Sequence, residues 1–337
     1  MLYPKFLKEN DTIGVPAPSD SAEDKKETNK FKQSIKYFEE NYKLKLSKNL
    51  FDSKMGRSSD AKTRGKEINE MFKDNNIDFI FSAAGGEFLI ECLPYIDFEL
   101  LKNNPKFVAG FSDPTGILFP ITTKYDIATI YGKNFRAFGT EKLCKSHNDF
   151  LSLAKGKKFS FKSYPLYENE RIKSVTGLEP YNLRKRVKWK TLDGNDTEIK
   201  GRIIGGCFDI ISEIMGTKYD GTQEFLERYK KDGIIWFFDN CELSYEETIR
   251  VLWKMNEFGY FKYCKGVVFG RFGADKESWL GYDVKKCLED SILGELKIPV
   301  IYDADISHKA ECLPILIGSI ATVTCAKNKG TIGFEMK

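Results

Sequence analysis

The stretch FVAGFSDPTG, residues 107–116, runs from a short apolar segment into a predicted helix. Its first four residues have the apolar and small side chains of a buried strand, and Pro114 suits the first turn of a helix, where its missing N–H is not needed. Ser112 lies in the turn between them, where a nucleophile elbow would expose a serine hydroxyl above the helix N-terminus. The match to G-x-S-x-G is partial because Pro114 replaces the second glycine, and a serine that only caps the helix is the alternative.

The residues around this stretch alternate short apolar runs with amphipathic segments. The pattern predicts strands and helices in turn at 11–16, 23–42, 60–73, 77–82, 114–123 and 127–131. Such alternation is typical of a parallel sheet covered by helices. We therefore expect an N-terminal α/β domain over residues 1–150.

Beyond residue 142 the pattern loosens into polar and aromatic residues interrupted by glycine and proline, which is typical of a connector. We place this connector at 151–200 and a C-terminal α/β domain at 201–337. In the second domain, apolar runs predict four strands and a terminal hairpin at 202–204, 233–238, 266–269, 299–302 and 315–336. A chain of 337 residues is long for one core, which also favours two domains.

The composition narrows the classes of function. The 53 basic and 49 acidic residues are scattered and leave a net charge of +4, which falls short of the basic patch of a nucleic-acid-binding protein. The first residues form no signal peptide and no run of 18 apolar residues occurs, so we expect a cytoplasmic protein without a membrane partner. Eight cysteines without a CxxC pair suit reduced thiols and give no ligand pattern for a structural zinc ion.

Histidine is scarce, and this limits the candidates for acid–base chemistry near neutral pH. His308 follows the apolar run 299–302, and loops after strands bring side chains to the carboxyl edge of a sheet. His147 lies in a polar stretch and is predicted at a surface turn or a helix end. His308 is therefore the better partner for Ser112, although a lone histidine also suits a purely structural place.

Two glycine pairs follow predicted strands. Gly85-Gly86 ends the run SAAGG, and Gly205-Gly206 follows the strand at 202–204. Backbone N–H groups at such turns can approach an oxyanion, but a glycine pair is as readily a tight turn. The residues leave both interpretations open.

Taken together, these segments resemble the LD-carboxypeptidase family of serine peptidases, whose members act on murein peptides or on aminoacyl-nucleotide antibiotics. The resemblance extends over almost the whole chain and keeps the order of the segments. It rests on GVPAPS (14–19), SAAGG (82–86), LPYID (93–97), GFSD (110–113), GRIIGG (201–206), GT (216–217), IWFFD (235–239) and DADISH (303–308).

The resemblance implies a catalytic triad made of Ser112, Asp239 and His308. The family has glutamate where this chain has Asp239, and the shorter aspartate can still orient an imidazole. Glu242, three residues further on, is the alternative acid. The resemblance also implies an oxyanion hole formed by the backbone N–H groups of Gly86 and Asp113.

The family's fold implies a flavodoxin-like N-terminal domain with a parallel sheet, a C-terminal domain of mixed strands and helices, and an active site in the cleft between them. The resemblance further implies a homodimer that needs no metal and no other cofactor. One departure touches the cleft, because Cys207-Phe208 stands where we expect Asn-Leu in the family. This difference bears on the substrate rather than on the reaction.

The predicted reaction is hydrolysis of the bond between an L-residue and a C-terminal D-residue in a murein-type peptide, through an acyl-enzyme on Ser112. A carboxypeptidase must also hold the terminal carboxylate of its substrate, and Arg271, just after a predicted strand, is the candidate. One alternative is an amidase that cleaves aminoacyl-nucleotide antibiotics of the microcin C type, with Trp189 or Trp279 stacking on the base. Another is a catalytically silent ligand-binding relative, for which the change at Asp239 is the main argument.

Overall fold

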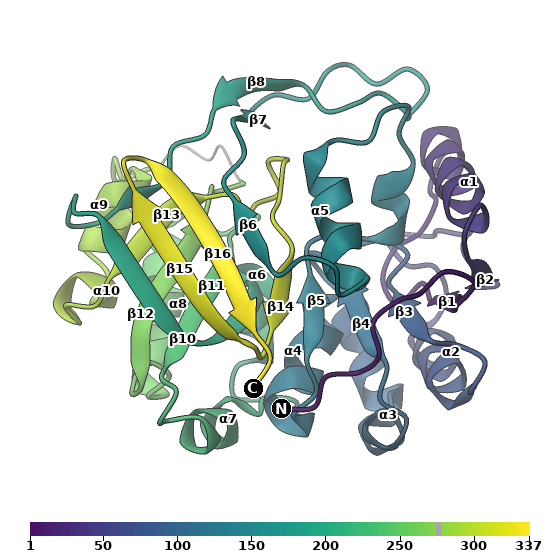
Figure 1. Cartoon of the computed structure of the whole chain (residues 1–337), viewed down its shortest axis with the longest axis horizontal. Coiled ribbons are helices and arrows are strands. Elements are labelled where there is room, and N and C mark those ends of the chain that lie inside the picture. The colour runs from purple at the N-terminus through teal and green to yellow at the C-terminus, as the bar shows by residue number, and fades with distance from the viewer. Residues whose placement is uncertain (274–277) are drawn as a thin grey trace.

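The computed structural model describes residues 1–273 and 278–337, and within them two large sheets are flanked by helices (Figure 1). The strands of the first sheet are β1 (Thr12–Val15), β2 (Lys43–Leu46), β3 (Phe79–Phe81), β4 (Phe107–Gly110), β5 (Thr129–Tyr131) and β14 (Ile315–Ile317). They lie in the order β14-β5-β4-β3-β1-β2, and only the β14 edge is antiparallel among the described strands. The order 2-1-3-4-5 is that of flavodoxin-like sheets, which confirms the predicted fold of this half.

Helices connect the parallel strands of the first sheet or follow its last parallel strand, β5. They are α1 (Lys25–Glu39), α2 (Ala61–Lys73), α3 (Phe98–Asn103), α4 (Thr115–Tyr125) and α5 (Lys145–Ala154), with the 3₁₀ segments η1 (Leu89–Tyr95) and η2 (Phe135–Phe138). Asp24 and Asp60 start the first two helices, because their side chains accept hydrogen bonds from backbone N–H groups of the first turn.

The second sheet is mixed. Its strands are β6 (Ser160–Lys162), β9 (Lys190–Thr191), β10 (Thr197–Cys207), β11 (Ile234–Asp239), β12 (Cys264–Gly270), β13 (Val300–Ala304), β15 (Ile320–Ala326) and β16 (Lys329–Glu335). They lie in the order β6-β16-β15-β10-β11-β12-β13-β9, with a parallel centre from β10 to β13 and antiparallel strands at both edges.

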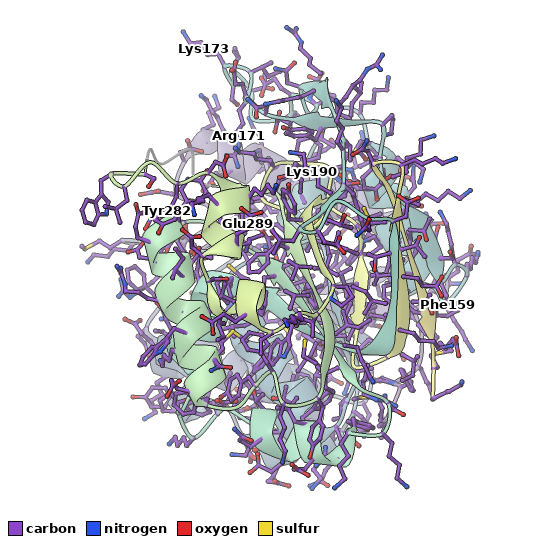
Figure 2. The ribbon with its side chains drawn as sticks, turned by 90° about the vertical axis from the view of Figure 1, so that its left-hand side faces the viewer. Phe159, Arg171, Lys173, Lys190, Tyr282 and Glu289 are labelled. Atoms are coloured by element: carbon purple, nitrogen blue, oxygen red, sulfur yellow. The ribbon has the colours of Figure 1, made fainter. Side chains whose placement is uncertain are left out.

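Helices also flank the second sheet, and Figure 2 looks onto this half from the side that carries Glu289. The helices are α6 (Phe208–Ile214), α7 (Thr222–Arg228), α8 (Tyr245–Glu257), α9 (Val284–Glu289) and α10 (Ile292–Glu295). In the part of the chain that the structure describes, no helix has both the length and the apolar character required to cross a bilayer.

Helix α4 forms the boundary between the two halves. It is buried from Thr115 to Thr123, and it contacts β4 and β5 on one side and β10, α6 and α7 on the other. A helix that is buried all round needs apolar residues on every face, which explains why α4 lacks an amphipathic pattern. The residues that precede α4 therefore lie between the two sheets.

The segment expected as a connector leaves the second sheet after β6 and returns to it at β9. Between these strands, residues 163–187 arch over both halves in Figure 1 and contain the pair β7 (Leu166–Glu168) and β8 (Leu183–Arg186). We call this segment the arch. Arg171 and Lys173 lie on it near the top of Figure 2.

The last residues differ from the single hairpin expected over 315–336. Strands β15 and β16 form that hairpin, whereas β14 pairs with β5 of the first sheet. The chain therefore crosses from the second sheet to the first between β13 and β14 and returns between β14 and β15.

Candidate active site

Ser112 lies in the turn between β4 and α4, and its backbone has a φ of 69°. A positive φ is unusual for a residue with a side chain, and it is typical of the sharp turn of a nucleophile elbow. The turn is fixed by Asn134, whose Oδ1 accepts a hydrogen bond from Phe111 N and whose Nδ2 donates to Phe111 O, both at 2.9 Å. The serine hydroxyl is thus held in a defined place at the boundary of the two halves.

His308 and Asp239 approach this serine from the second sheet. His308 lies in the loop after β13, and Asp239 is the last residue of β11. Nε2 of His308 is 2.8 Å from Ser112 Oγ, and Nδ1 is 2.9 Å from Asp239 Oδ1. These contacts have the connectivity of a Ser-His-acid triad, and the aspartate reaches the ring despite its shorter side chain.

Tyr131 is a part of the site that the sequence analysis missed. Its buried hydroxyl donates to Asp239 Oδ2 at 2.7 Å and accepts a hydrogen bond from Ser112 N at 3.3 Å. Tyr131 therefore holds the second oxygen of the acid and contacts the nucleophile turn. The available signal was its place at the end of a predicted strand, because loops and residues at the carboxyl ends of parallel strands meet at one sheet edge.

The imidazole of His308 is easier to protonate than free histidine. Burial disfavours the imidazolium, but the Asp239 carboxylate against Nδ1 outweighs burial and holds the pKa of His308 well above its usual 6.5. The ring of Phe111 packs against it, with 4.6 Å between the ring centroids. The site thus stabilises the positive charge that a general base acquires.

Gly85 lies beside the serine and is followed by Gly86, for which the resemblance implied a place in the oxyanion hole. A Cβ on Gly85 would lie 3.2 Å from Ser112 Cβ, and a Cβ on Gly86, where φ is +153°, would lie 2.9 Å from Asp20 Cβ. The backbone N–H groups of Gly86 and Asp113 donate to no acceptor among the described residues. Unpaired N–H groups next to a nucleophile are what a developing oxyanion requires.

The side chain of Asp113 ties the nucleophile turn to neighbouring loops. Its Oδ2 accepts hydrogen bonds from Ser19 Oγ and from Leu89 N, the latter at 2.9 Å. Burial raises the pKa of the Asp113 carboxyl to about 7, although both hydrogen bonds favour the ionised form.

Arg271 does not present a free guanidinium to the cleft. It is buried, and Nη1 donates to Asp305 Oδ1 at 2.5 Å. Nη2 donates to the carbonyl oxygens of Lys309 and Glu311 at 2.9 and 2.8 Å. Arg271 thus supports the loop that carries His308, and the expectation that it binds a substrate carboxylate does not fit this geometry.

The two candidate tryptophans also lie elsewhere than expected. Trp189 is fully buried, and its Nε1 donates to Asp305 Oδ2 at 3.0 Å, so its ring has no free face for a nucleotide base. Trp279 is 80% exposed and does not line the cavity beside His308. Neither supports the predicted stacking.

His147 lies in the first turn of α5, but the expected surface position is wrong because the residue is fully buried. Its Nε2 is 2.9 Å from the carbonyl oxygen of Ala137, and its Nδ1 accepts a hydrogen bond from Cys144 N at 3.2 Å. Burial lowers the pKa of His147 to about 3, and the Lys133 ammonium acts in the same direction. The ring is therefore a neutral helix cap.

The second glycine pair belongs to β10 rather than to a turn. A side chain at Gly206 would collide with Thr115 at the start of α4, and Cys207 N donates to Thr115 Oγ1 at 3.0 Å. The pair thus allows the two halves to approach closely. Glu242 has an exposed side chain, and it is Asp239 that contacts Nδ1 of His308.

A cavity of about 300 Å³ opens beside His308. Its walls come from the loops after β4 and β5, from the loop that carries His308 and from the arch, and they include Phe111, Lys133 and Tyr181. The arch therefore roofs the space next to the imidazole.

Known proteins match both halves of the chain. Residues 13–132 match the LD-carboxypeptidase N-terminal domain, and residues 200–323 match the LD-carboxypeptidase C-terminal domain. A putative carboxypeptidase of Vibrio cholerae is 24% identical, covering 99% of this chain and 96% of that protein. The microcin C7 self-immunity protein MccF of Escherichia coli is 25% identical over 86% and 84% of the two chains. A probable murein peptide carboxypeptidase of Bacillus subtilis is 22% identical over 98% and 93%.

Solved structures share the fold. A MccF-like protein from Bacillus anthracis superimposes with a TM-score of 0.84 at 24% identity, over 100% of both chains. MccF in complex with aspartyl sulfamoyl adenosine superimposes with a TM-score of 0.81 at 22% identity, over 100% of this chain and 99% of that one. The likeness covers both sheets and the arrangement between them.

Proposed function

This chain belongs to the LD-carboxypeptidase family, and on that premise we propose that it is a serine peptidase that removes the C-terminal residue of a peptide. The observation that carries the proposal is the unbroken hydrogen-bond chain from Ser112 through His308 to Asp239. Ser112 is the nucleophile, His308 is the general base, and Asp239 orients the imidazole.

The first half of the reaction forms an acyl-enzyme. His308 Nε2 takes the proton of Ser112 Oγ as the oxygen attacks the carbonyl carbon of the last peptide bond. The Asp239 carboxylate stabilises the imidazolium, and the N–H groups of Gly86 and Asp113 receive the oxyanion. The intermediate then expels the amine of the C-terminal residue, which takes its proton from His308.

The second half of the reaction releases the shortened peptide. His308 removes a proton from water, which attacks the acyl carbon. The tetrahedral intermediate breaks down with return of the proton to Ser112 Oγ. No step in this sequence uses a metal ion or another cofactor.

We propose a murein-type peptide, cut between an L-residue and a C-terminal D-residue, as the substrate. The Bacillus subtilis relative supports this choice, because its name assigns it to murein peptides. The contact between Asp239 and His308 argues against a catalytically silent relative, for which the aspartate was the main argument. The homodimer and the cytoplasmic location stay predictions.

A second candidate is an amidase that acts on aminoacyl-nucleotide antibiotics. The observation that favours it is Tyr181, an aromatic side chain in the wall of the cavity beside His308. The solved complex of MccF with aspartyl sulfamoyl adenosine supports this class of substrate for a protein of the same fold.

The proposal is tested by covalent labelling of Ser112. We expect a serine-directed phosphonate to add its mass to the wild-type protein at Ser112 and to leave the Ser112→Ala protein unmodified. Turnover of a tetrapeptide that ends in D-alanine should fall by about 10³ or more in Ser112→Ala and in His308→Ala. Turnover of an aminoacyl-sulfamoyl adenosine, compared with turnover of the tetrapeptide, decides between the two substrate classes. Near-normal turnover by Ser112→Ala would contradict the assignment of Ser112 as the nucleophile.

A further inference from the structure

The cavity beside His308 contains a lysine that the mechanism above does not use. Lys133 follows β5, lines this cavity and is only 5% exposed. In the described part of the chain, its ammonium has no hydrogen-bond acceptor within 3.5 Å and no carboxylate oxygen within 4.0 Å, and it lies 5.2 Å from the centroid of the Tyr181 ring. Burial of an ammonium without a partner is unfavourable, so this position calls for an anion that the protein itself does not supply.

The backbone around Lys133 is tied to the nucleophile turn. On one side, Gly132 N donates to the carbonyl oxygen of Gly110 at 3.0 Å. On the other side, Asn134 makes its two hydrogen bonds to Phe111. Lys133 therefore keeps a fixed place relative to Ser112.

The surroundings of Lys133 keep the cavity positively charged. Lys30, Arg136 and Arg171 also line it. Burial and the nearby Arg136 guanidinium lower the pKa of Lys30, as expected where cations crowd together. Burial alone would lower the pKa of Lys133, but Tyr181, two cysteines and Glu311 outweigh burial and raise it.

The acidic groups near the cavity are engaged by the protein. Glu179 accepts hydrogen bonds from the backbone N–H groups of residues 175–177. Glu168 accepts one from Asn182 N at 2.8 Å, and the buried Glu311 accepts one from Ser146 N at 2.6 Å. Of the cations in the cavity wall, Arg136 is paired with Glu27 at 2.7 Å. Among the described cations in the cavity wall, Lys133 is the buried one that has no ion pair.

The cavity lies where the departing residue of a substrate must go. The leaving amine takes its proton from His308, so the departing residue lies on the His308 side of Ser112. Its carboxylate is attached to the carbon that carries this amine, and the cavity begins at His308. We propose that Lys133 binds the C-terminal carboxylate of the departing residue and thereby selects peptides with a free carboxyl end. This role rests on the proposed function and deepens it. Lys133 would bind the carboxylate that the sequence led us to expect at Arg271.

The test compares two tetrapeptides that end in D-alanine, one with a free carboxylate and one with a C-terminal carboxamide. In Lys133→Met we expect kcat/KM for the free acid to fall about 10- to 100-fold, the range for loss of a hydrogen bond to a charged group. The value for the carboxamide should not change, so that the preference for the acid disappears. Lys133→Arg should keep most of the preference, and Lys185→Met, an exposed lysine of the arch outside the cavity wall, is the matched control.

Binding measured by calorimetry on the Ser112→Ala protein separates this proposal from the proposed function. Tighter binding of the acid than of the carboxamide, lost in Ser112→Ala/Lys133→Met, supports the carboxylate site even if hydrolysis proves not to need Ser112. Three results would each overturn the carboxylate site. They are equal losses of affinity for the acid and the carboxamide, an unchanged preference for the acid in Lys133→Met, and no preference in the parent protein. Melting curves of each variant show whether the fold is kept.

Discussion

The two histidines of this chain have opposite surroundings. His308 lies at the boundary between the sheets with an aspartate against Nδ1, and its pKa is raised well above 6.5. His147 lies inside the first half with backbone partners and the Lys133 ammonium nearby, and its pKa falls to about 3. Both rings are largely removed from water, so burial alone does not separate them.

The difference shows that the partner of a buried imidazole decides whether it can carry a proton. A carboxylate stabilises the imidazolium, whereas a carbonyl oxygen and a backbone N–H leave the ring neutral. Changes to the partners of His308 should therefore alter activity and its pH dependence. Changes at His147 should alter stability instead.

Asp239→Asn should have the largest effect, because it removes the group that distinguishes the two histidines. We expect kcat/KM to fall about 10³- to 10⁴-fold, since the amide favours the wrong tautomer and does not stabilise the imidazolium. In the proposed mechanism neutral His308 is the base, so activity should be lost as pH falls through its raised pKa. Without the Asp239 carboxylate this acid limb of the pH profile should move to lower pH. A pH profile of kcat/KM measures both effects. Glu242→Gln is the control, and a larger loss there would transfer the role of the acid to Glu242.

Tyr131→Phe should have an intermediate effect. Loss of the hydroxyl removes the donor to Asp239 Oδ2 and the acceptor for Ser112 N, and we expect about a tenfold fall in kcat/KM, the worth of one hydrogen bond to a charged group. Without this donor, the Asp239 carboxylate stabilises the imidazolium of His308 more strongly. The acid limb of the pH profile should therefore move to higher pH, whereas in Asp239→Asn it should move to lower pH. An unshifted limb in the pH profile would mean that Tyr131 acts only through packing.

His147→Gln should have the smallest effect on activity, within about twofold at pH 7, because it alters no group that we assign to the reaction. Its effect is on stability. Because the folded pKa lies below 6.5, His147 stabilises the fold fully above pH 6.5, and this contribution is lost as pH falls. Between pH 7 and pH 5, the free energy of unfolding of the wild type should fall by about 2 kcal/mol more than that of His147→Gln. Urea unfolding at the two pH values measures this, and equal losses would place His147 in contact with water.

Much of the fold could be predicted because its signals are local. Residues 107–116 and the scarcity of histidine made Ser112 and His308 candidates, whereas the complete triad with Asp239 followed only from the resemblance to the family. The role of Tyr131 could not be predicted in this way, because its partner Asp239 is 108 positions away and belongs to the other sheet. A strand pattern says where a residue lies along the chain but not which distant group it faces.

Two of the misplaced residues, Arg271 and Trp189, share one cause. Arg271 and Trp189 both bond to the carboxylate of Asp305, which is fully buried. A buried carboxylate requires donors, and it draws a guanidinium and an indole N–H inward from places where sequence alone suggests exposure. Asp305 itself stands three residues before His308 in the segment DADISH, so the demand for these donors arises from the loop that carries His308.

The crossing of β14 into the first sheet restricts how this protein could admit a substrate. The loop with His308 starts from β13 in one sheet and ends at β14 in the other, so both of its ends are anchored on opposite sides of the cleft. A hinge motion that parted the two halves would have to stretch this loop and strip β14 from β5, which are paired along their length. The arch over the cavity is tied down as well, because Lys26 Nζ and Asn29 Nδ2 of α1 donate to the carbonyl oxygens of Ser174 and Thr176, and Glu168 N donates to that of Ala310 in the loop with His308. We therefore expect the two halves to stay clamped, so that Ser112, His308 and Asp239 keep their mutual contacts while a substrate enters and leaves.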